Sequence, residues 1–134
     1  MKKFSLSLVL GFIINNVVAT MIAMFILNPF LNPMFNGVVR TQEEGLEMPS
    51  LLSGYFILTL FMVIGYKHFT LDAIWLKKRI LWGLLIGGIT FVAGHLIVAV
   101  WATIPPIPMF ISGILDTLAT VATGIFIAYI YRNE

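Results

Sequence analysis

Two ionisable side chains stand inside long apolar stretches of this sequence, where charged groups are rare. Asp116 is the only acidic residue within such a stretch, and His95 is the only ionisable residue deep inside the preceding one. A carboxylate and an imidazole can exchange a proton or hold a cation, and ionisable groups inside a membrane commonly mark transport paths or proton relays. This pair is therefore the first candidate for chemistry in the chain.

The depth of the two residues follows from counting away from the turn between the two stretches. Prolines at positions 105, 106 and 108 set that turn, because proline cannot continue a helix interior. Asp116 and His95 each lie about ten residues from its centre, roughly 16 Å at 1.5 Å per helical residue. In an antiparallel hairpin they are level, so they can pair if the helix rotations agree, and pairing lowers the penalty of a buried charge.

Three further polar residues are predicted to lie near this pair. Asn15 and Asn16 stand near the middle of the first apolar stretch, and Thr120 follows Asp116 by one turn on the same helical face. The resulting polar layer has two interpretations: a site that titrates or binds a cation, or a hydrogen-bond cluster that only fixes helix register. No metal ion or cofactor is expected, because one histidine and one carboxylate do not complete a coordination shell.

The elements that must position this layer follow from composition. Of the 134 residues, 60% are hydrophobic and only 10% are charged, and the mean hydropathy is +1.00. A water-soluble domain of this size cannot hide so much apolar surface in one core. The apolar residues form four blocks suited to a bilayer core of roughly 30 Å. The sequence predicts an all-α fold, an integral membrane four-helix bundle built as one transmembrane domain over residues 1–134.

Turn residues and aromatic residues set the expected limits of the helices. Asn28-Pro29 is predicted to end the first helix, because proline disfavours the helical conformation of the preceding residue. Trp75 and Trp82 are predicted to anchor the start of the third helix at the membrane interface. The expected helices cover about 5–27, 51–66, 80–103 and 107–131, with an outer loop over 28–50 and a cytoplasmic loop over 67–79.

The basic residues give the expected orientation. Seven of them fall on one side of the predicted membrane and only Arg40 on the other; the seven are Lys2, Lys3, Lys67, Lys77, Lys78, Arg79 and Arg132. Cytoplasmic loops carry such an excess, so both termini are predicted to be cytoplasmic in a multi-pass protein of the cell membrane, typical of a bacterial inner membrane.

The run Lys77-Lys78-Arg79 is interpreted mainly as the topology determinant, with contact to anionic lipid head groups as a second interpretation. Basic residues confined to short loops beside apolar blocks do not form a nucleic-acid-binding face. Nucleic acid is therefore not an expected partner.

Small residues predict where helices approach each other. Gly11 is the first of four small or polar residues that stand four positions apart on the first helix. Gly83, Gly87 and Gly94 fall along one side of the third helix. Such stripes let helices pack closely in lipid, where the hydrophobic effect no longer drives association. They indicate packing within the bundle or, as the alternative, the face of a homodimer.

The order of these parts resembles that of the small four-span bacterial inner-membrane proteins grouped as a domain-of-unknown-function family. The segments that carry the resemblance are Asn32-Pro33-Met34-Phe35-Asn36-Gly37, Met48-Pro49-Ser50, Gly83-Leu84-Leu85-Ile86-Gly87 and Ile114-Leu115-Asp116-Thr117-Leu118. The resemblance implies a helical fold in a bacterial inner membrane and brings no activity with it.

Function is less determined than fold. No set of nucleophile, base and orienting residue, no phosphate-binding glycine loop and no metal motif can be assembled, so an enzyme is not expected. An accessory, structural or partner-binding membrane protein ranks first. The alternative is a small dimeric transporter or channel that uses Asp116 and His95 for proton or cation coupling. The expected partners are the lipid bilayer and a second copy or another membrane protein.

Overall fold

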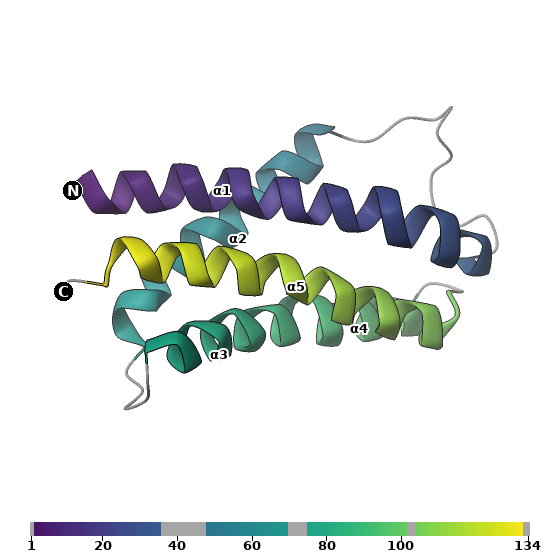
Figure 1. Ribbon diagram of the computed structural model, residues 1–134. Helices are drawn as coiled ribbons and strands as arrows, with labels where there is room; N and C mark the ends of the chain where they lie inside the picture. The colour runs from purple at the N-terminus through teal and green to yellow at the C-terminus, as the bar shows by residue number, and fades with distance from the viewer. Residues whose placement is uncertain (1, 36–47, 70–74, 102–103, 133–134) are drawn as a thin grey trace.

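The computed structural model describes residues 2–35, 48–69, 75–101 and 104–132, and every regular element in these ranges is helical (Figure 1). The elements, in chain order, are α1 (Lys2–Ile22), η1 (Ala23–Leu31), η2 (Asn32–Phe35), α2 (Met48–His68), α3 (Trp75–Gly87), η3 (Gly88–Ala93), α4 (Gly94–Trp101) and α5 (Pro106–Ile130). Of these, η1 and η3 are π-helical and η2 is a 3-10 helix, and each continues the helix before it.

Four of the described helical segments are long and apolar enough to cross a membrane, which confirms the prediction of four spans and indicates a membrane protein. They run over Lys2–Phe35, Met48–His68, Leu76–Val100 and Pro106–Ile130. In Figure 1, α1, α5 and the α3–η3–α4 segment lie side by side, whereas α2 crosses them obliquely. Both termini lie at one end of the bundle, here called the terminal end.

The first helix is longer than predicted, because Asn28-Pro29 does not end it. From Ala23 the helix widens into the π-helical segment η1, which contains Pro29 and runs to Leu31. In a π turn the backbone bond reaches back five residues instead of four, as the N–H of Asn32 does to the carbonyl of Leu27. The wider turn accommodates a proline ring that a regular α-helix would not.

The second and third helices also begin before their predicted starts. α2 starts at Met48, with Pro49 in the first turn, where its missing N–H has no helical partner in any case. α3 starts at Trp75, so the predicted loop over 67–79 is partly helical. Of the two predicted loops, residues 36–47 and 70–74 lie outside the described part of the chain. The predicted fourth helix, 107–131, agrees with α5 to within one residue at each end.

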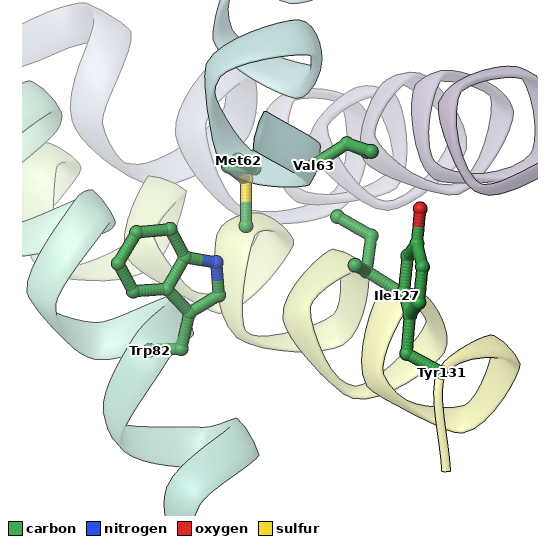
Figure 2. Packing of buried hydrophobic residues seen from close by; sticks show 5 residues of the cluster. All are labelled: Met62, Val63, Trp82, Ile127 and Tyr131. Carbon is green, nitrogen blue, oxygen red and sulfur yellow. The ribbon is translucent and has the colours of Figure 1, made fainter. Parts of the chain in front are cut away.

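An aromatic and aliphatic cluster holds α2, α3 and α5 together near the terminal end. Its buried members, shown in Figure 2, are Met62, Val63, Trp82, Ile127 and Tyr131. The prediction that Trp82 is an interfacial anchor is wrong, because its side chain is only 7% exposed. Gly65 makes this possible: a Cβ at that position would lie 2.7 Å from the indole ring. The side chain of Trp75 lies outside the described part of the structure.

Close helix contacts occur at three of the four predicted packing glycines. A Cβ on Gly83 would lie 2.7 Å from the carbonyl oxygen of Thr120, and one on Gly87 would lie 2.9 Å from the Cα of Thr117. A Cβ on Gly11 would approach a methyl group of Thr59 to 3.0 Å. These positions let α1 and α3 pack tightly within the bundle.

Gly94 does not pack within the bundle, since a Cβ there would meet nothing within 4 Å, and the homodimer alternative stays a prediction for this residue. Gly94 lies eleven residues after Gly83, which in a regular α-helix is a rotation of only about 20°. Between them, however, η3 spans Gly88–Ala93 as a π-helical segment. One extra residue in such a wide turn rotates everything beyond it by about 100°, and this carries Gly94 off the packed face.

Candidate functional site

The structure brings His95 of α4 and Asp116 of α5 together. The imidazole Nε2 lies 3.8 Å from the carboxylate Oδ2, and the two side chains are 25% and 14% exposed. The hydroxyl of Ser112, one turn before Asp116, is 3.5 Å from the same carboxylate oxygen. A separation of 3.8 Å is an ion-pair distance rather than a hydrogen bond, which needs about 2.7–3.2 Å. The pair is close but not tightly bonded.

The π-helical segment that displaces Gly94 also explains why His95 faces Asp116. Counted as a regular α-helix, His95 would be rotated by about 120° from Gly83, away from α5. With one extra residue in η3, His95 returns to within about 20° of the Gly83 face, which packs on α5. The wide turn therefore positions the imidazole, and π turns of this kind are frequent at functional sites.

A groove between α2 and η3 adjoins the pair. It has a volume of about 300 Å³ and is lined by Ser50, Leu51, Gly54, Tyr55, Leu58, Thr90 and Phe91. The ring of Phe91 lies 5.9 Å from that of His95, and Tyr55 is close enough to Asp116 for the phenol and the carboxylate to interact electrostatically. The groove follows from the oblique path of α2, which leaves its first half little covered by the other helices.

The other three predicted members of the layer do not hydrogen-bond to the pair. The hydroxyl of Thr120 lies 2.9 Å from the carbonyl oxygen of Gly83 on α3 and 2.7 Å from that of Thr117 in its own helix, and its single proton can bond to either. The amide of Asn16 donates to the carbonyl of Phe12 at 2.8 Å, within its own helix. These two residues therefore stabilise helices and helix packing, and neither completes the His95–Asp116 site.

Asn15 is a different case, because it is fully buried and neither its amide nitrogen nor its amide oxygen has a hydrogen-bond partner among the described residues. It lies on the buried stripe of α1 one turn beyond Gly11, which packs against Thr59 and Thr123. The stripe places Asn15 in the bundle interior, on the side of α1 that packs against α2 and α5.

Several other buried polar atoms in the described bundle also have no partner. They include Ser7 Oγ on the α1 stripe and the hydroxyl of Tyr131. Leaving a buried polar group unpaired costs about 1–3 kcal/mol, so natural proteins usually pair such groups with protein atoms, bound water or an ion. Ser7 and Asn15 lie two turns apart on the buried stripe of α1, where their unpaired atoms suit bound water better than dry packing.

The ligand set limits what this site can bind. Among the described residues, no three His, Cys, Asp or Glu side chains are grouped closely enough to hold a metal ion. The Asp116 carboxylate, the His95 imidazole and the Ser112 hydroxyl can instead accept and release a proton, or hold one weakly dehydrated monovalent cation. The geometry is that of a proton- or cation-handling site.

Sequence reasoning missed Ser112, Tyr55 and Ser7. Ser112 had a usable signal, because it precedes Asp116 by four residues and so lies on the same helical face. Tyr55 had none, since the sequence does not specify how α2 crosses α5. Ser7 shares the four-residue spacing of Gly11 and Asn15, and extending that stripe by one turn would have included it.

The predicted basic run divides into three different environments. Lys77 is exposed, Lys78 is half-buried, and Arg79 is only 4% exposed. The backbone of Arg79 packs against α5, where a Cβ on Gly124 would lie 3.1 Å from its carbonyl oxygen. The interpretation of Arg79 as a lipid contact is therefore wrong, because the protein itself covers this side chain.

Comparison with protein-family models, with curated proteins and with solved structures finds no match to this chain. The resemblance to small four-span bacterial proteins stays a prediction from the order of its segments.

Proposed function

We propose that the chain is a small membrane transport protein in which Asp116 and His95 bind and release a proton or a monovalent cation. The observation that supports this most directly is the 3.8 Å approach of the imidazole to the carboxylate inside two membrane-length helices. Two ionisable groups placed together at that depth are costly to keep unless they serve a function.

The alternative of a saturated structural cluster is less well supported by the geometry. A residue with a purely structural role stabilises the bundle by completing its hydrogen bonds, as Thr120 does with backbone carbonyls. The site around Asp116 instead has a long pair distance and a long bond from Ser112. Loose geometry suits a group that must change its protonation or its ligand.

Four helices enclose little volume, so the proposal includes a second copy that completes the path across the bilayer. The orientation proposed for each copy has both termini in the cytoplasm of a bacterial inner membrane. It rests on the seven-to-one distribution of basic residues.

The test is proton flux into proteoliposomes that contain a pH-sensitive dye and carry an imposed potential. Asp116→Asn and His95→Gln are each expected to lower the protein-dependent flux at least about tenfold. His68→Gln, which changes an exposed histidine at the end of α2, is the matched control and should leave the flux unchanged. Wild-type flux in Asp116→Asn, or no protein-dependent flux for protons, Na⁺ or K⁺, would contradict the proposal.

A second candidate function, an accessory protein that binds another membrane protein, is favoured by one observation. In the most apolar window of α2 only 17% of residues are buried, against 44% for α5. The chain contains no cysteine, so Gly54→Cys in the groove gives a single cross-linking position without background. An accessory role predicts an adduct with a different protein in native membranes, whereas the transport homodimer predicts adducts of twice the chain mass.

A further inference from the structure

A second polar feature lies at the terminal end, away from the His95–Asp116 pair. It is a pocket of about 260 Å³ lined by Tyr66 and Lys67 from the end of α2, Lys78 from the first turns of α3, and Tyr131 directly after α5. Its lining combines ammonium donors with aromatic rings, and three separate helices contribute to it. Sequence spacing alone does not bring these four residues together.

The lysines of this pocket are held by the aromatic rings. Nζ of Lys67 lies 5.3 Å from the ring centre of Tyr131, and Nζ of Lys78 lies 6.0 Å from that of Tyr66. The two tyrosine rings pack against each other with their centres 6.0 Å apart. Ammonium groups within about 6 Å of a ring are attracted to its face, so both are positioned before any ligand arrives.

The electrostatic surroundings favour an anion. The only carboxylate among the described residues is Asp116, which is paired with His95 far along the bundle. The hydroxyl of Tyr131 is buried and has no hydrogen-bond partner among those same residues, in a side chain that is 7% exposed. That hydroxyl points into the bundle beside Val63 (Figure 2), so the two ammonium groups are the donors that the pocket offers to phosphate oxygens.

We infer that this pocket binds a phosphate group, and that its source is the head group of an anionic phospholipid. Basic pockets between membrane helices on the cytoplasmic side commonly bind phospholipid head groups, and the basic residues predict that this end is cytoplasmic. A volume below the roughly 300 Å³ of typical small-molecule sites fits a head group whose acyl chains remain in the bilayer. This inference is independent of the transport proposal, because it uses none of the same side chains.

The test measures lipid retained by the purified full-length protein in native mass spectrometry, with phosphatidylglycerol and phosphatidylcholine offered in equal amounts. Lys67→Gln/Lys78→Gln is expected to lower phosphatidylglycerol retention by about tenfold or more, given the usual contribution of each basic residue at a membrane surface. The matched control is Lys2→Gln/Lys77→Gln, which removes two exposed charges from the same end and should keep most of the binding.

Three outcomes would overturn the inference. Equal loss in the control variant would show that net charge, and not the pocket, attracts the lipid. Equal retention of inorganic phosphate and of phosphatidylglycerol by the protein would identify a free anion as the ligand and contradict a lipid source. Phosphatidylglycerol that is retained only by the double variant Asp72→Asn/Glu134→Gln would show that a carboxylate of the chain itself occupies the pocket. Both of these residues lie outside the described part of the chain.

Discussion

The two halves of the bundle differ in their helix geometry and in the ionisable groups that they hold. Toward the terminal end, the hydroxyl groups of Thr59, Thr120 and Thr123 all bond to backbone carbonyls, and Trp82 fills the space above Gly65. Toward the opposite end, the helices widen into π turns, the His95–Asp116 pair is long, and a groove opens beside α2. The terminal half is closely packed, whereas the other half combines a close contact of Gly113 with η3 and a loosely paired ionisable site.

This difference indicates where the chain is stabilised and where it acts. In lipid, helices associate through close packing and interhelical hydrogen bonds, and the terminal half supplies both. Sites that exchange protons or ions need room and imperfect pairing, which the other half provides. The account predicts that substitutions in the terminal half mainly change stability, whereas substitutions near the pair mainly change function.

The largest effect is expected at the helix contact of the closely packed half. Gly83→Leu would drive a side chain into the backbone of Val121 and Thr120, so the variant should lose more than about 3 kcal/mol or fail to assemble. Gly88→Leu is the matched control, because a Cβ there meets nothing within 4 Å. Thermal unfolding in detergent measures both, and equal loss in the two variants would remove the distinction between the halves.

A large effect on function alone is expected from changing the length of η3. Inserting one leucine after Ile89 should rotate His95 by about 100° away from α5 and lower proton flux about tenfold or more. Deleting Ile89 should convert the wide turn into a regular one and keep His95 facing Asp116, so flux should survive. If the deletion abolishes flux and the insertion does not, the π turn is not what points His95 toward Asp116.

A smaller effect on stability is expected from Thr120→Val. This change removes the hydrogen bond to the Gly83 carbonyl at nearly constant volume, so the free energy of unfolding should fall by about 1 kcal/mol. Proton flux should stay near wild type, because Thr120 does not bond to the pair. Chemical unfolding in mixed micelles measures the free energy of unfolding. A tenfold loss of flux would show that Thr120 belongs to the functional site.

The smallest effect on stability is expected from Asn15→Leu. Its amide atoms are buried without partners among the described residues, so an apolar replacement should leave stability within about 1 kcal/mol of wild type or raise it. Proton flux should stay near wild type, because among the described residues Asn15 makes no hydrogen bond to His95 or Asp116. A loss of several kcal/mol with unchanged flux would identify Asn15 as a structural residue.

Some of this architecture could be predicted because it depends on composition and on counting. The blocks of apolar residues predicted four membrane-length helices, and the prolines after residue 104 gave a reference from which Asp116 and His95 are equally distant. That count holds because few residues separate the end of α4 at Trp101 from the start of α5 at Pro106. The residues that flank this connection therefore share a depth whatever the helix rotations are.

The rest could not be predicted because it depends on rotation and on contacts between helices. No residue in Gly88–Ala93 signals a π turn, so Gly94 was expected on the face that His95 takes. Trp82 has the sequence context of an interfacial anchor, and only the glycine opposite it on α2 shows why it is buried. The pocket at the terminal end joins residues from three helices and has no local signature.

The central claim is that Asp116 and His95 form one site that exchanges a proton or cation. The most direct measurement is infrared difference spectroscopy of the Asp116 carboxyl band in lipid nanodiscs from about pH 4 to pH 9, with Asp116→Asn to assign the band. The account predicts that the band titrates within this range and that its midpoint moves in His95→Gln. A carboxyl group that keeps one protonation state throughout this pH range, or a titration midpoint that is the same in wild type and His95→Gln, would contradict this claim.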